Sequence, residues 1–160
     1  MGKYKVLTAD QIKKGVELPP LAVEVSATTV VLGAMASRDW RPLHHDRDFA
    51  IHRIGTKDIF LNAPAQAAWF ERYLTDWSGP KGRIGRMRFR MRDPVFPGDT
   101  MAFGGVVEKV ETDARGCSWA EVALTLRVGE QTRTSCRARI ALPSQTGDNP
   151  WTRRDDDWKP

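Results

Sequence analysis

Residues 62–80, NAPAQAAWFERYLTDWSGP, decide the fold of this 160-residue chain. We predict a helix over 62–77, because Asn62 can cap its start and Pro64 falls in the first turn, where a missing N–H costs little. Apolar residues recur every four positions along it: Leu61, Ala65, Trp69, Tyr73 and Trp77. Small alanines between them keep the helix slim, as a helix enclosed by a sheet requires, and Ser78-Gly79-Pro80 ends it.

The sequence after this helix alternates apolar and polar residues, which is the pattern of half-buried strands. Four strands are predicted, over 83–93, 100–110, 117–128 and 131–142. Another strand is predicted over 21–27, followed by an apolar helix over 28–37. One long helix against a mainly antiparallel sheet is an α+β layout. A sheet wrapped around one long central helix is the hot-dog fold, and its open edge predicts at least a dimer.

The chain is expected to form a single domain over residues 21–142, with an N-terminal arm over 1–20 and a polar C-terminal tail over 143–160. Cys117 and Cys136 lie in separate predicted strands without CxxC spacing, so two reduced thiols are expected. The N-terminus is rich in lysine and has no apolar run, and no stretch reaches transmembrane length. We therefore expect a cytoplasmic protein with no membrane partner.

The formal net charge of +5 attracts polyanions, and nucleic acid, acidic lipid and phosphorylated cofactors all fit that charge. The most basic segment is the predicted strand 83–93, which carries Arg86, Arg88, Arg90 and Arg92 on one face. One interpretation of this face is a solvated surface. Nucleic-acid binding would need aromatic side chains among the arginines, but Phe89 falls on the opposite face. No nucleic-acid partner is expected.

The densest polar cluster lies at residues 38–46, RDWRPLHHD, in a loop that Pro42 keeps from being helical. A carboxylate five positions before an imidazole lets the loop fold Asp39 and His44 over one small space. There they could hold a single water, with Asp39 as base and His44 as proton donor or orienting group. The alternatives are a polar loop with one structural histidine and a metal site. Adjacent histidines on a loop rarely converge on a metal, so none is expected.

The stretch 39–46, DWRPLHHD, resembles the motif D-x-N-P-x-H-x-D of MaoC-like acyl-CoA hydratases and dehydratases. The stretch 94–99, PVFPGD, resembles that family's second signature, PV-x-x-GD. Segments 57–62, KDIFLN, and 72–80, RYLTDWSGP, are similar to the small catalytic subunits of actinobacterial steroid side-chain enoyl-CoA hydratases. The resemblance covers roughly residues 22–142.

The resemblance implies an enzyme that adds water to a trans-2-enoyl-CoA thioester, or removes it from the 3-hydroxyacyl-CoA. Asp39 and His44 match the catalytic pair of the motif. Asn62 and Ala63 begin the long helix, where backbone N–H groups would polarise the thioester carbonyl. Arg41 stands where many relatives have an Asn that positions substrate. No metal or redox cofactor is implied, because coenzyme A enters only as part of the substrate.

The same resemblance implies a homodimer or a hetero-oligomer with a second hot-dog subunit. Coenzyme A carries phosphates, so Arg86, Arg88 and Arg90 are candidates to bind it. One alternative function is a non-catalytic or acyl-CoA-binding subunit of a heteromeric hydratase. Another is a hot-dog thioesterase, whose acid usually lies on the long helix, where this chain offers only Glu71 and Asp76.

Overall fold

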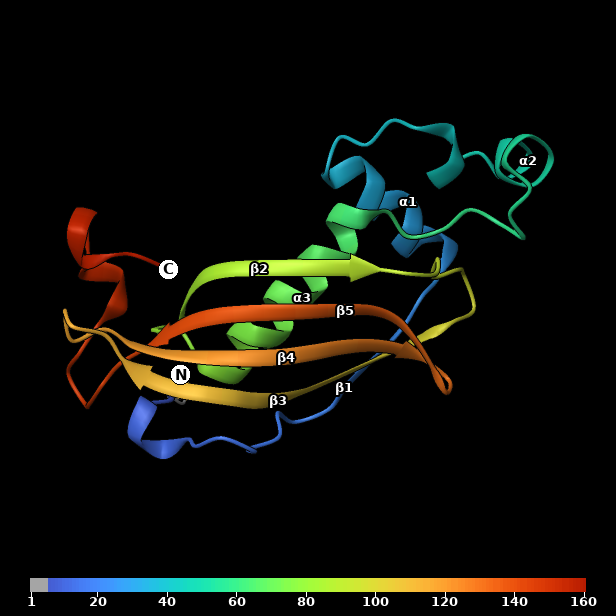
Figure 1. Ribbon diagram of the computed structural model, residues 1–160. Helices are drawn as coiled ribbons and strands as arrows, with labels where there is room; N and C mark the ends of the chain where they lie inside the picture. Colours follow the sequence, from blue (N-terminus) through green and yellow to red (C-terminus); the bar gives the residue numbers. More distant parts are fainter. Residues whose placement is uncertain (1–5) are drawn as a thin grey trace, which may run out of the picture.

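The computed structural model describes residues 6–160 and shows one five-stranded antiparallel sheet with a long helix against one face (Figure 1). The strands are β1 (Leu21–Glu24), β2 (Arg83–Met91), β3 (Thr100–Thr112), β4 (Ser118–Val128) and β5 (Gln131–Leu142). Their order in the sheet is β1-β3-β4-β5-β2, so β1 and β2 form the two edges. The predicted α+β layout, an antiparallel sheet around one long helix, is confirmed.

The long helix, α3 (Ala63–Ser78), begins and ends where the capping residues require. The Asn62 side chain accepts a hydrogen bond from the Ala65 N–H at 3.1 Å, and Pro64 lies in the first turn. Gly79 has φ 74°, a left-handed conformation that favours glycine, and its N–H donates to the Thr75 carbonyl. Local sequence alone therefore fixes both ends of α3.

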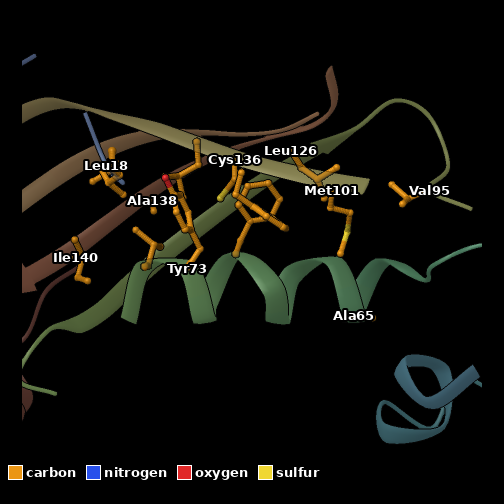
Figure 2. Close-up of a cluster of buried hydrophobic side chains, with 14 of the residues drawn as sticks. Leu18, Ala65, Tyr73, Val95, Met101, Leu126, Cys136, Ala138 and Ile140 are labelled. Carbon is orange, nitrogen blue, oxygen red and sulfur yellow. The ribbon is translucent and has the colours of Figure 1, made fainter. Parts of the chain in front are cut away.

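The buried face of α3 is rotated relative to the predicted apolar stripe. Phe70, Tyr73 and Leu74 are buried, whereas Trp69 and Trp77 are only partly covered. Steps of four residues overshoot a 3.6-residue turn by about 40° each, so a strict four-residue stripe drifts around the helix. Figure 2 shows Tyr73 of α3 among side chains from the sheet, including Leu126, Cys136 and Ile140. Cys136 and Cys117 are both buried and unbonded.

A helical segment between β1 and α3 lies beyond one end of the sheet (Figure 1). Its elements are α1 (Ala27–Ala36), η2 (Pro42–His44), α2 (Arg47–Phe49) and η3 (Ala50–Ile54). Strand β1 ends earlier than predicted, because Ser26 caps α1 through the Thr29 N–H at 3.0 Å. This segment carries the polar loop above the start of α3.

The two ends of the described chain lie against the sheet. In the N-terminal arm, η1 (Ala9–Gln11) is a short turn, the side chains of Leu7, Ile12 and Leu18 are buried, and Glu17 bridges to Val106 of β3. Residues 1–5 of the predicted arm lie outside the described residues. The C-terminal tail, with η4 (Pro150–Thr152) and η5 (Asp155–Asp157), follows the surface at the end opposite α1 and α2 (Figure 1).

The tail makes a defined contact, because the Trp158 ring packs 4.9 Å from Trp119 of β4 between ring centroids. The guanidinium of Arg83 in β2 also lies over the Trp158 ring, 3.5 Å from the ring centroid. Across residues 6–160, the structure contains no helix with the length and apolar character needed to cross a membrane.

Candidate active site

The polar loop begins with a sharp change of chain direction after α1. Arg38 adopts φ 54°, a left-handed conformation that is uncommon for a residue with a side chain. The Asp39 N–H then donates to the Ala34 carbonyl at 2.9 Å, which holds Asp39 at the end of α1. Pro42 starts the short η2 turn, whose last residue is His44. Two turns in six residues thus bring Asp39 and His44 to one point.

Asp39 and His44 face each other, with 3.4 Å between the Asp39 Oδ2 and His44 Nε2 atoms. The His44 side chain is buried, at 2% exposure of the residue. Its Nδ1 atom lies 2.7 Å from the Phe60 carbonyl oxygen, which can only accept, so Nδ1 carries a proton. In the neutral imidazole the lone pair is therefore on Nε2, on the side of Asp39.

Asp39 is held as an anion by several donors. Arg41 donates from Nε and a terminal nitrogen to the two carboxylate oxygens, at 2.8 and 2.7 Å, and Asn62 donates at 3.1 Å. The Arg41 hydrogen bonds are the main cause that lowers the pKa of Asp39 far below its ordinary value. Burial lowers the pKa of His44, although the Phe60 carbonyl and the Asp39 charge oppose it. The pair is therefore an anionic carboxylate beside a neutral imidazole.

Asn62 ties this pair to the start of α3. Its amide nitrogen donates to Ser37 at 2.8 Å and to Asp39, while its oxygen caps the helix at Ala65. Within residues 6–160, the backbone N–H groups of Asn62 and Ala63 have no acceptor. Pro64 has no N–H and the Ala65 N–H is used by the cap, so Ala63 keeps a free donor in the first turn.

A cavity of about 330 Å³ opens beside the pair. Its lining residues come from the polar loop, the start of α3 and the end of β2: Arg41, Leu43, His44, Phe60, Leu61, Ala63, Gln66, Met91, Arg92, Asp93 and Pro94. The sequence analysis missed Gln66, which is buried one turn into α3 and accepts a hydrogen bond from Thr134 at 2.6 Å. A lone glutamine on an alanine-rich helix face was the signal for it.

The second signature, residues 94–99, borders the cavity at Pro94 and packs against the segment before α3. The Val95 carbonyl accepts the Leu61 N–H at 2.9 Å, directly before the cap of α3. Asp99 folds the turn by accepting the Phe96 N–H at 2.9 Å, and Gly98 adopts φ 89°. The signature therefore positions Asn62 and Ala63 rather than contributing a reactive group.

Arg86, Arg88 and Arg90 are exposed and do not line this cavity, although Arg92 of the same arginine series does. The two carboxylates of the thioesterase alternative, Glu71 and Asp76, are exposed on α3 away from it.

The other polar residues of the loop have structural contacts. His45 lies 3.2 Å from the Trp40 carbonyl oxygen, and Asp46 caps α2 by accepting from the Phe49 N–H at 3.0 Å. His52 is exposed. In the described part of the chain no cluster of three or more histidine, cysteine, aspartate or glutamate side chains could hold a metal ion.

The sequence of this chain is similar to those of one known protein family. The family model for the MaoC like domain matches residues 8–130. Over 96 residues, 60% of this chain and 74% of the relative, the sequence is 40% identical to the 3-oxo-4,17-pregnadiene-20-carboxyl-CoA hydratase beta subunit of Mycobacterium tuberculosis.

Two solved structures illustrate the likeness in space. The ChsH1-ChsH2 complex from Mycobacterium tuberculosis contains a chain with a TM-score of 0.74 and 32% identity, covering 81% of this chain and 97% of that one. The (R)-hydratase from A. caviae involved in PHA biosynthesis has a TM-score of 0.72 at 22% identity, covering 82% of this chain and 98% of that one. The similarity to the (R)-hydratase shows a shared fold, which is the hot-dog fold expected from the sequence.

Proposed function

Because this chain belongs to the MaoC-like domain family, we propose that it is an enoyl-CoA hydratase that adds water to a trans-2-enoyl thioester and catalyses the reverse dehydration. The observation that carries the proposal is the Asp39–His44 pair, 3.4 Å apart beside the cavity and the free N–H of Ala63. A hydratase needs a water next to a base and a donor for the thioester oxygen, and this arrangement offers both.

In the first step, a water between the two side chains donates one hydrogen bond to Asp39 and one to His44 Nε2. We assign the proton to His44, because the low pKa of Asp39 makes that carboxylate the weaker base. As the water oxygen bonds to C3, the proton moves to Nε2 and the C2–C3 electron pair shifts toward the thioester carbonyl. Asp39 stabilises the imidazolium that forms, and the Phe60 carbonyl keeps its orientation.

In the second step, the enolate carbonyl oxygen accepts a hydrogen bond from the Ala63 N–H, where the dipole of α3 also favours negative charge. The imidazolium then returns its proton from Nε2 to C2, which restores the neutral histidine. One side chain takes and returns the proton on one side of the substrate, so the two new bonds form with syn geometry. A donor of this kind contributes about 3–4 kcal/mol to transition-state stabilisation in known cases.

We further propose that the acyl group is polycyclic and that a second hot-dog subunit completes the binding site. The support is the 40% identity to a subunit of a pregnadiene-carboxyl-CoA hydratase and the fold shared with the ChsH1-ChsH2 complex. Thioesterase activity is less favoured, because Glu71 and Asp76 lie away from the cavity. A purely scaffolding subunit would have no chemical need for the Asp39–His44 pair.

The test is a hydration assay that follows loss of the enoyl-thioester absorbance with crotonyl-CoA and with a polycyclic enoyl-CoA. It is run on the chain alone and on the chain mixed with a candidate second hot-dog subunit. Turnover that disappears in Asp39→Asn supports the proposal. A folded protein that turns over neither thioester, alone or with its partner, rules out the hydratase assignment.

A further inference from the structure

Gln66 is a buried amide in the wall of the cavity beside His44, one turn into α3. Taking an amide out of water is unfavourable unless both its oxygen and its nitrogen find partners. The buried hydroxyl of Thr134 in β5 donates to Gln66 Oε1 at 2.6 Å, and Gln66 Nε2 donates to the Leu61 carbonyl oxygen at 3.4 Å. A carbonyl oxygen can only accept, so the amide atom that faces Leu61 is the nitrogen. The two neighbours therefore fix which way the amide is turned.

The Leu61 carbonyl depends on this side chain. Leu61 lies before the cap of α3 and is buried, and within residues 6–160 no backbone N–H donates to its carbonyl oxygen. A buried carbonyl without a donor costs free energy, and the Gln66 amide satisfies it. The Leu61 N–H is bound to the Val95 carbonyl at 2.9 Å. Gln66 thus sets the plane of the peptide group between Leu61 and Asn62.

Gln66 also holds the next peptide group, the one between Asn62 and Ala63. Its backbone N–H donates to the Asn62 carbonyl at 3.1 Å, the ordinary first bond of a helix. The described chain has no cis peptide bond, so in each of these two peptide groups the N–H points opposite to the carbonyl. These are the N–H groups of Asn62 and Ala63, which have no acceptor within residues 6–160. One residue therefore orients both free donors at the start of α3.

A purely structural fastening of α3 to β5 would need only the bond between Gln66 and Thr134. The hydrogen bonds continue from Gln66 to Leu61, and both of these residues line the cavity. An unbranched apolar side chain at position 66 would fill a similar space and would need no partner. The amide therefore serves the contact with Leu61, next to the place proposed for the thioester oxygen.

We propose that Gln66, anchored by Thr134, is a positioning residue for the thioester oxygen. Its side-chain amide holds the Asn62 N–H, and its backbone N–H holds the Ala63 N–H, in the directions from which both donors reach the enolate oxygen. Donors stabilise a transition state best when they are aimed before the charge develops. The inference rests on the proposed hydratase function, which assigns these N–H groups to the thioester.

The first experiment measures kcat and KM for hydration in Gln66→Met and Thr134→Val, each of which removes one hydrogen bond and keeps a similar volume. Gln66→Met should lower kcat about tenfold with little change in KM, less than the roughly 10²-fold or more that follows loss of a whole donor. Thr134→Val should lower kcat by a smaller factor, because Gln66 loses its anchor but keeps its donor. Thr134→Ser restores the hydroxyl and should restore kcat.

Two controls separate positioning from structure. Thr132→Val makes the same change on the same strand, at a threonine with no side-chain hydrogen bond within residues 6–160, and should leave kcat unchanged. Phe70→Ala on α3 should lower stability but not kcat. Values of kcat within twofold of wild type in both Gln66→Met and Thr134→Val would overturn the proposal. If Gln66→Met does not fold, Thr134→Val against Thr134→Ser decides, and equal kcat in those two would overturn it.

A second measurement does not depend on turnover. Acetoacetyl-CoA loses a C2 proton to solvent, and its enolate, which shares its negative charge with the thioester oxygen, absorbs in the near ultraviolet. Two aimed donors stabilise that charge and lower the pKa of the bound ligand. We expect the wild type to bind the enolate at a pH at which free acetoacetyl-CoA is mostly protonated. Gln66→Met should bind several-fold less of it.

The two proposals fail separately. If no enoyl thioester is hydrated, the hydratase assignment fails, and the acetoacetyl-CoA titration still decides the role of Gln66. An enolate that is bound by the wild type and lost in Gln66→Met supports that role. Equal enolate binding by the two proteins, or none by the wild type, overturns it.

Discussion

The two ends of α3 differ in what they bury. At its start, the side chains of Asn62 and Gln66 are buried with both amide oxygen and amide nitrogen hydrogen-bonded, and a cavity lies beside them. Further along, Phe70 and Leu74 are fully buried among apolar side chains of the sheet. The difference shows how one helix serves two purposes, because the apolar part anchors the helix and the anchored helix holds the polar end in place.

The largest effect is expected from Asp39→Asn at the polar end. Loss of the carboxylate removes both the water's acceptor and the charge that stabilises imidazolium, so kcat should fall by about 10²–10⁴-fold. The fold should survive, because the variant keeps the size of the side chain. Hydration kinetics and circular dichroism measure the two effects. Activity within a few-fold of wild type would remove Asp39 from the proposed mechanism.

Phe70→Ala at the apolar end is expected to lower stability and to leave activity nearly unchanged. A buried Phe→Ala change costs about 3–5 kcal/mol of unfolding free energy, through lost burial and the cavity that it leaves. Urea denaturation measures this cost. The activity of the folded fraction should change little, and Trp69→Ala on the partly covered side is the control, with a smaller expected cost. If Phe70→Ala lowered kcat as strongly as Asp39→Asn, the stabilising role of the apolar end could not be separated from the catalytic role of the polar end.

Asn62→Ala lies at the junction of the two regions and should affect both. Loss of the helix cap costs about 0.5–2 kcal/mol of stability. Loss of the bond to Asp39 should also lower kcat, because the carboxylate is less firmly oriented. Asn62→Asp is the informative comparison, since it keeps a capping oxygen but places a second carboxylate beside Asp39. The unfolding temperature of Asn62→Asp should be closer to that of wild type than the unfolding temperature of Asn62→Ala is. The activity of Asn62→Asp should be no closer to wild type than that of Asn62→Ala.

The smallest effect is a change in pH dependence. The proposed mechanism needs neutral His44, so kcat/KM should fall as pH decreases through the pKa of His44, which burial places below its ordinary 6.5. Arg41 lowers the pKa of both Asp39 and His44. Arg41→Asn should therefore move the acid limb of the kcat/KM profile to higher pH. An acid limb that stays in place would show that Arg41 does not tune the pair, and Arg47→Asn, an exposed arginine of the same segment, is the control.

Much of the fold could be predicted from local sequence. The capping residues gave α3 to within one residue at each end, and alternation gave the four strands from β2 to β5. The rotation of the buried face of α3 could not be predicted in the same way. Trp69 and Phe70 are neighbours of similar hydrophobicity, and only the position of the sheet decides which of them is covered.

The sequence by itself determined the elements, the Asn62 cap and the spacing of Asp39 and His44, because these depend on contacts between residues close in the chain. Only the tertiary structure decided the chemical state of the pair. The proton on His44 is fixed by the carbonyl of Phe60, 16 residues away, and Asp39 is bound to Asn62, 23 residues away. The hydrogen bond between Gln66 of α3 and Thr134 of β5 also requires the folded sheet. Such contacts depend on how elements pack, and a pattern along one segment does not contain that information.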